Sequence, residues 1–368
     1  MHNNKMVVSN TSVSNGKRLD WIDIMKALMI FAIVLGHSFT GEDRGDNMLK
    51  QYLYSFHVPA FFFVSGFVYK NKAESFGAFA IKKLKGLMIP YYIFAIISIL
   101  IFMALGSLAS GGLGVEVRST DILPNICGML YASGSSGYMK WNLPLWFIPC
   151  LFVTLLLFYG IVRLVSRAKK GSKAVWVSVF VAFLVLAFLN YYVFNLKKLP
   201  FGFEIVVYMF PFFMAGYWLK ENDVIAKIQG RLRVVLGIAF IVIGAVLACM
   251  ADHCVDYVYS IYNNLFMFYI VAFISIMGYV LILQSFSNKL LVYVGRNTLP
   301  ILLMHKFPII ALQMVLGGII AKNAILGMCI TVVMAIVSCI MSLVAGEIIK
   351  RIAPFALGTA KPKTTKEK

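Results

Sequence analysis

The sequence contains a series of apolar runs, each long enough to cross a lipid bilayer as one helix. A helix needs roughly 20 apolar residues to span the hydrocarbon core, where its backbone hydrogen bonds must be satisfied internally. The runs therefore predict an all-α polytopic membrane protein, a bundle of about ten transmembrane helices. The predicted spans are 21–40, 52–70, 87–107, 143–163, 174–194, 203–220, 232–251, 263–284, 298–320 and 324–349.

Composition agrees with this fold class. Of the 368 residues, 61% are hydrophobic and only 13% are charged, which excludes an ordinary soluble domain. The net charge of +19 would suggest nucleic acid in a soluble protein. Here the basic residues cluster in alternate loops, so we interpret them as topology signals and contacts for membrane lipids. No basic soluble domain is present to bind nucleic acid, and we expect no such partner.

The distribution of Lys and Arg predicts the orientation. An even number of spans places both termini on one side, and segments on that side hold twenty-five Lys and Arg against seven in the opposite loops. The positive-inside rule therefore predicts cytoplasmic termini in a cell (inner or plasma) membrane. We expect a cytoplasmic N-terminal segment over 1–20, a ten-helix membrane domain over 21–350 and a basic cytoplasmic tail over 351–368. The first span lacks a cleavage pattern and is predicted to stay uncleaved.

The first predicted span carries three ionisable residues. Lys26 and His37 are eleven residues apart, which places them on one helix face about 16 Å apart. Asp23 lies three residues before Lys26 and can pair with it across one turn. Ionisable side chains inside a span are costly and usually face the protein interior or a wet cavity. We therefore predict that this face is the functional wall of the protein.

Three further residues could join a site there. His57 is near the outer end of the second predicted span, at a depth similar to that of His37. A neutral imidazole can accept a proton from a hydroxyl group, although a lone His in an apolar stretch is more often structural. Trp146 opens the fourth span, and His305 lies inside the ninth, where it should face protein or water. Two histidines with an aligned Lys and Asp favour a catalytic site.

A basic group stands at the predicted cytoplasmic entrance of the third span. Lys82, Lys83 and Lys85 lie within one helical turn, and Tyr91 follows. Such a group suits a phosphate-bearing ligand, and the alternative is an ordinary contact with anionic lipid. The six cysteines show no metal-ligand spacing, so no metal site is predicted.

Five stretches, in this order, resemble the acyltransferase family 3 membrane proteins, particularly the branch described as fucose 4-O-acetylase-like. The family's first helix pairs a basic residue with a His eleven positions later, as Lys26 and His37 do here. Lys replaces the commoner Arg at that position, which loses the planar fork for phosphate. The other matches are Phe56 to Gly66 (FHVPAFFFVSG), Lys82 to Tyr91, Asn142 to Phe147 (NLPLWF) and Gly295 to His305 (GRNTLPILLMH).

The resemblance implies an O-acyltransferase that moves an acyl group, usually acetyl, from acetyl-coenzyme A to a hydroxyl of a cell-surface or lipid-linked glycan. Acetyl-coenzyme A is then a substrate that enters from the cytoplasm. By resemblance, His37 is the catalytic histidine and Lys26 its basic partner. The supporting residues are Asp23, His57, Trp146 and His305, and the donor-binding residues are Lys82, Lys83, Lys85 and Tyr91.

We expect the pantetheine arm of the donor to pass along the Lys26 face towards His37. His37 would either activate the acceptor hydroxyl or take the acyl group itself. A transporter or flippase is the alternative from another class, with Asp23, Lys26, His37 and His305 as a proton relay. Broken helices and inverted repeats, which are typical of transporters, are not apparent in the sequence. A noncatalytic membrane scaffold is a third interpretation, and the polar face argues against it.

Overall fold

The computed structural model describes residues 19–39, 48–106, 121–133, 139–167, 173–222, 228, 230–251, 254–320 and 324–359. These residues form helices, with one isolated β-bridge between Asp256 and Ile261. The helices are α1 (Asp20–Ser38), α2 (Met48–Phe67), α3 (Phe76–Lys83), α4 (Ile89–Gly106), α5 (Ile122–Tyr131), α6 (Phe147–Arg167), α7 (Lys173–Leu189), α8 (Phe203–Glu221), α9 (Gly230–Cys249), α10 (Leu265–Leu283), α11 (Lys289–Arg296), α12 (Thr298–Met304), α13 (Lys306–Ile320) and α14 (Ala324–Ile352).

Every predicted span falls on a helix, and the chain is an all-α polytopic membrane protein. By length and composition, eight of the described helical segments can cross a membrane, and the pair α12–α13 would add a ninth, against the ten spans predicted. Helix α2, which corresponds to the predicted span 52–70, is the one that is not among them. The segment that corresponds to the third predicted span runs from Phe76 to Ala104 through a π-helical turn at Leu84–Met88, so it begins well before the predicted residue 87. The lysines of the predicted basic group therefore lie on the helix itself.

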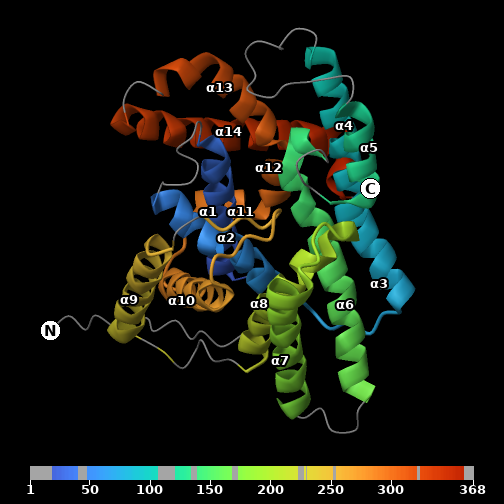
Figure 1. Cartoon of the computed structure of the whole chain (residues 1–368), viewed down its shortest axis with the longest axis vertical. Helices are drawn as coiled ribbons and strands as arrows, with labels where there is room; N and C mark the ends of the chain where they lie inside the picture. The colour runs from blue at the N-terminus through green and yellow to red at the C-terminus, as the bar shows by residue number, and fades with distance from the viewer. Residues whose placement is uncertain are drawn as a thin grey trace, which may run out of the picture.

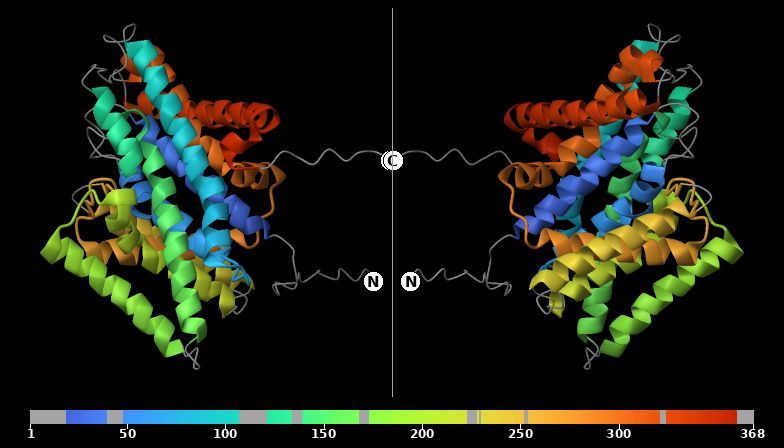
Figure 2. Two further views of the ribbon diagram at one scale, coloured as in Figure 1. Left: turned by 90° about the vertical axis from the view of Figure 1, so that its right-hand side faces the viewer. Right: turned by 90° about the vertical axis from the view of Figure 1, so that its left-hand side faces the viewer.

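Helix α2 lies at the centre of the bundle and contacts α1, α8, α9 and α10 (Figure 1). Most of its residues are buried, although it carries Lys50, Gln51 and His57. In contrast, α7 and α9 lie at the outside, and nearly all of their apolar side chains are partly or fully exposed. Helices α13 and α14 pack side by side across one end of α1 (Figures 1 and 2). The polar residues of α2 are therefore enclosed by protein, as side chains of that kind inside a membrane must be.

The ninth predicted span is broken, which the sequence analysis did not foresee. Helices α12 and α13 meet at His305 with a bend of 51°. Pro308 explains the break, because proline has no N–H to donate to the carbonyl of Met304 and its ring clashes with that carbonyl. The His305 carbonyl accepts two hydrogen bonds, from the Ile309 N–H at 3.3 Å and from the Ser338 hydroxyl of α14 at 2.8 Å. The bend places the His305 side chain at the junction of two helices.

The contact between α2 and α8 depends on two glycines. A Cβ atom at Gly66 would lie 1.9 Å from the Phe213 carbonyl oxygen, and a Cβ atom at Gly216 would lie 1.9 Å from the Phe63 carbonyl oxygen. Small residues let membrane helices approach this closely and pack backbone against backbone. Since α2 carries Tyr54 and His57, this contact also fixes the position of these two side chains.

We predict that Gly66→Ala or Gly216→Ala separates α2 from α8 and destabilises the folded protein by about 1–3 kcal/mol, because either new methyl group overlaps backbone. The measurement is the apparent melting temperature of the detergent-solubilised protein, read from its monodisperse chromatographic peak. Gly160→Ala in α6 is the matched control, since nothing lies within 4 Å of the new Cβ. Equal melting temperatures for all three variants would contradict the close contact.

Candidate active site

Three histidines and one tyrosine form a chain of ring contacts, which we call the histidine cluster. The His37 ring, at the end of α1, lies 5.4 Å from the His305 ring and 6.5 Å from the Tyr54 ring, measured between centroids. The Tyr54 ring in turn lies 4.8 Å from the His57 ring. Gly36 allows this approach, because a Cβ atom there would lie 2.3 Å from Tyr54 Cε2. The structure thus brings together His37, His57 and His305, which are far apart in the sequence.

Tyr257 extends this cluster to Trp146. It lies in the segment between α9 and α10, and its ring centroid is 5.8 Å from that of His57 and 6.2 Å from that of Trp146. The Tyr257 hydroxyl donates a hydrogen bond to the Tyr54 carbonyl. Burial raises the pKa of Tyr257 well above its usual value, and the nearby Tyr54 and Asp256 act in the same direction. The hydroxyl therefore stays protonated and remains a donor.

Backbone carbonyls orient two of the histidines. His57 Nδ1 lies 2.6 Å from the Leu53 carbonyl oxygen, and His305 Nδ1 lies 2.8 Å from that of Ile301. A carbonyl only accepts, so this geometry assigns the proton to Nδ1 in both rings and leaves Nε2 able to accept a proton. The His305 Nε2 is buried and has no hydrogen-bond partner among the described residues. The cluster can therefore accept protons inside the bundle.

Asn142 fixes the start of α6 next to the cluster. Its amide nitrogen donates to Ser98 Oγ and to the Leu303 carbonyl, both at 3.0 Å, and so joins α4 to α12. The Asn142 oxygen is buried without a partner among the described residues. Trp146 ends the 3₁₀ segment Lys140–Trp146, which is kinked at Asn142, and its buried ring stacks on that of Tyr257.

At the opposite end of α1, the predicted ion pair between Asp23 and Lys26 is present, at 2.7 Å. Arg296 of α11 also contacts Asp23, with Nε 3.1 Å from Oδ2. Asp23 is 1% exposed, so the two cations compensate a buried charge. Helix α1 is continuous from Asp20 to Ser38, which keeps the backbones of Lys26 and His37 about 16 Å apart.

The space between Lys26 and His37 is filled. Ile30, Ile33 and Val34 lie on that face of α1, and each is at most 5% exposed. Among the described residues, apolar side chains pack along the Lys26 face and leave no open path of the kind expected there. A role for Lys26 as the catalytic partner of His37 stays a prediction.

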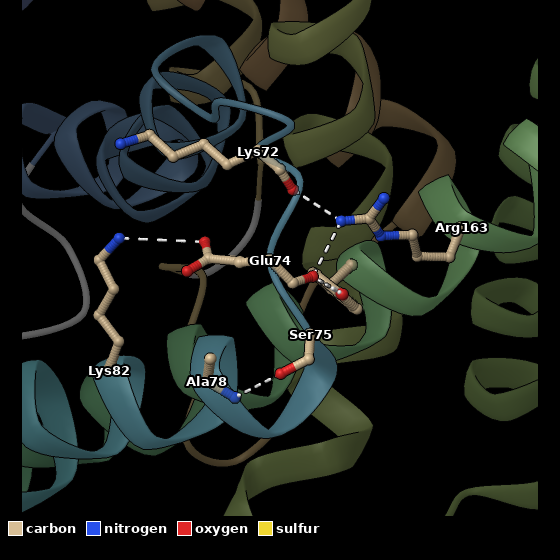
Figure 3. Close-up of polar contacts among 7 residues, drawn as sticks. Lys72, Glu74, Ser75, Ala78, Lys82 and Arg163 are labelled. Atoms are coloured by element: carbon tan, nitrogen blue, oxygen red, sulfur yellow. Dashed lines mark hydrogen bonds and ion pairs between the residues drawn. The ribbon is translucent and has the colours of Figure 1, made fainter.

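A basic cleft of about 580 Å³ opens between α2, α3 and α6. Lys82 and Lys83 line it, as do Lys70 and Lys72 from the loop before α3. Figure 3 shows the Lys72 and Lys82 side chains on one side of this loop, with Arg163 of α6 on the other. Arg163 donates to the carbonyls of Lys72 and Glu74, at 2.6 and 3.0 Å, and so fastens the loop. The remaining lining residues are Ser65, Val68, Tyr69, Glu74, Phe79, Gly86, Leu87, Leu151, Leu155 and Gly358.

The structure separates the other two predicted donor-binding residues from this cleft. Lys85 is exposed and outside the cleft lining, and Tyr91 is buried, with its hydroxyl donating to the Met129 carbonyl at 3.1 Å. The sequence analysis also did not identify Glu74 as a residue of this cleft. Its carboxylate lies 3.9 Å from Lys82 Nζ, where it compensates part of the positive charge. Among the described residues, no group of three or more His, Cys, Asp or Glu side chains is arranged to hold a metal ion.

One family model matches the chain. The family model described as "Acyltransferase domain" matches residues 19–344, which is most of the chain. The chain belongs to this acyltransferase family. No curated protein and no solved structure matches it. The protein is therefore a multi-pass membrane acyltransferase, and its place in the fucose 4-O-acetylase-like branch stays a prediction.

We predict that Asp23→Asn in this acyltransferase lowers the apparent melting temperature by roughly 5 °C, since it leaves Lys26 and Arg296 without their shared carboxylate. Asp20→Asn is the matched control. Asp20 is in the same helical turn but partly exposed, and its oxygen accepts a 2.8 Å hydrogen bond from Ser287. A drop for Asp20→Asn as large as that for Asp23→Asn would contradict the special role of the buried carboxylate.

Proposed function

We propose that this membrane acyltransferase transfers an acetyl group from acetyl-coenzyme A to a hydroxyl of a cell-surface or lipid-linked glycan. The observation that carries the proposal is the position of two features along α2. The histidine cluster contacts its first half, through Tyr54 and His57, and the basic cleft reaches Ser65 near its other end. Eight residues, or about 12 Å, separate His57 from Ser65.

The two ends of a coenzyme A thioester match the two ends of this arrangement. Phosphates gather at one end of the molecule, and a long uncharged arm carries the acyl group at the other. The four cleft lysines suit the phosphates, because ammonium groups attract them and donate hydrogen bonds to their oxygens. The arm would then extend between α2 and α6 towards His57 and His37, a different route from the Lys26 face.

His37 acts as the general base in this proposal. Its imidazole accepts the proton of the acceptor hydroxyl, and the oxygen forms a bond with the thioester carbonyl carbon. The carbon–sulfur bond then breaks, the coenzyme A sulfur takes up a proton, and the acetyl ester remains on the acceptor. Hydrogen bonds to backbone carbonyls fix the rings of His57 and His305 within the cluster.

We predict that His37→Ala reduces transfer of label from [acetyl-¹⁴C]acetyl-coenzyme A to membrane glycan by more than about 100-fold, the range expected for loss of a general base. The variant should reach the membrane in normal amounts, because His37 is only partly buried at the end of α1. Ser38→Ala is the control, as the Ser38 hydroxyl donates a hydrogen bond to the Val34 carbonyl of its own helix. Transfer at the normal rate by His37→Ala would remove His37 from the reaction.

We predict that the double variant Lys82→Gln/Lys83→Gln raises the KM for acetyl-coenzyme A roughly tenfold and leaves kcat nearly unchanged, because it removes charge contacts made equally in ground and transition states. Lys289→Gln, an exposed lysine at the start of α11, controls for a change in surface charge. An unchanged KM in the double variant, or an equal rise in Lys289→Gln, would contradict donor binding in the cleft.

One observation favours the transporter as a second candidate. The bend of 51° at His305 breaks a span next to ionisable residues, and broken helices are typical of transporters. Family membership favours acyl transfer. The labelled-donor assay separates the two functions, since a transporter would move glycan across the membrane without making it radioactive.

A further inference from the structure

Helix α2 places three side chains in line between the cleft and the histidine cluster. Ser65, Phe61 and His57 are spaced four residues apart, so they lie on one face, each about one turn from the next. Ser65 lines the basic cleft, and His57 contacts Tyr54 and Tyr257 in the cluster. Phe61 therefore stands between them, about 6 Å from each along the helix axis.

Helix α6 has the same register on the facing side. Leu155, Leu151 and Phe147 are also spaced four residues apart, and both leucines line the cleft. Trp146, which precedes Phe147, packs on Tyr257 in the histidine cluster. Phe147 thus occupies on α6 the level that Phe61 occupies on α2.

The two phenylalanines meet across this seam. Their ring centroids are 5.6 Å apart with the planes at 64°, an edge-to-face contact. Phe62 supports Phe147 from behind, with centroids 5.3 Å apart, and is completely buried. Phe61 and Phe147 are both buried, with 9% and 7% of their surface exposed, so the two rings close the seam in this structure.

We propose that Phe61 and Phe147 form an aromatic gate, which closes the seam between α2 and α6 and opens when the arm of the acyl donor passes. This inference rests on the proposed function, since it takes the cleft as the donor site. A contact between two rings is worth about 0.5–1.5 kcal/mol beyond its burial, little enough for a bound ligand to displace. When closed, the gate keeps water in the cleft away from the histidine cluster.

The gate has a chemical consequence. Water that reaches the thioester beside a proton-accepting imidazole is itself a nucleophile. Its oxygen bonds to the carbonyl carbon, the carbon–sulfur bond breaks, and acetate and free coenzyme A thiol are released. Exclusion of water is the usual protection of an activated group against this loss. The gate therefore sets the ratio of transfer to hydrolysis.

The test measures coenzyme A thiol released from acetyl-coenzyme A by the purified, full-length protein with no added acceptor. We expect Phe61→Ala and Phe147→Ala to raise this release about fivefold or more, because either truncation opens the seam to water. Phe212→Ala is the matched control, since Phe212 is also a buried phenylalanine but packs against Phe273 of α10, away from the seam. Release unchanged in both gate variants, or raised equally in Phe212→Ala, would overturn the proposal.

A variant that enlarges the gate side chain tests the same proposal without the alanine variants, which could fail to fold. Phe61→Trp fills the seam further and should slow acetyl transfer to membrane glycan several-fold, with an unchanged KM for acetyl-coenzyme A, since the cleft itself is untouched. Transfer at the wild-type rate would contradict the gate. Failure of the proposed function has a different signature, because wild-type membranes would then transfer no label to glycan at all.

Discussion

The close contact of α2 with α8 is the constraint on which the rest of this structure depends. At Gly66 and Gly216 the two backbones approach so closely that no Cβ atom fits on either side. Membrane helices gain little from the hydrophobic effect, because lipid is as apolar as their side chains. Close packing therefore holds α2 at the centre of the bundle, where its polar residues are enclosed by other helices.

Because α2 is held in place, the histidine cluster, the Phe61–Phe147 contact and the basic cleft follow one another as three levels along one of its faces. His57 joins the histidine cluster, Phe61 meets Phe147 one turn further along, and Ser65 reaches the basic cleft after another turn. The break at Pro308 completes the first level, because it brings His305 within 5.4 Å of the His37 ring. Each level alone has an ordinary structural explanation. Their order along one helix face supports a donor that enters by its phosphates and reacts at its far end.

The sequence predicted the helices well, because span length and hydropathy are local properties. It also predicted the Asp23–Lys26 pair, which follows from the spacing of three residues on a helix. The bend at His305 was missed, although Pro308 was a visible signal for it. Periodicity shows which residues share a face but not what covers it, so the filled face between Lys26 and His37 could not be foreseen.

Other parts of the site come from segments without a periodic pattern. Tyr257 reaches the cluster only because the segment between α9 and α10 folds back over α2, and its hydroxyl bonds to the Tyr54 carbonyl. Lys70 and Lys72 join the cleft because Arg163 fastens their loop. Tertiary contacts of this kind have no signature in a single sequence.

The most direct test of this account is a cryo-electron microscopy map of the protein with a non-hydrolysable acetyl-coenzyme A analogue. The account predicts density for the phosphates between Lys72 and Lys82, with the acyl end between α2 and α6 at the level of Phe61 and Phe147. Density for the ligand along the Lys26 face of α1, with the cleft empty, would contradict it.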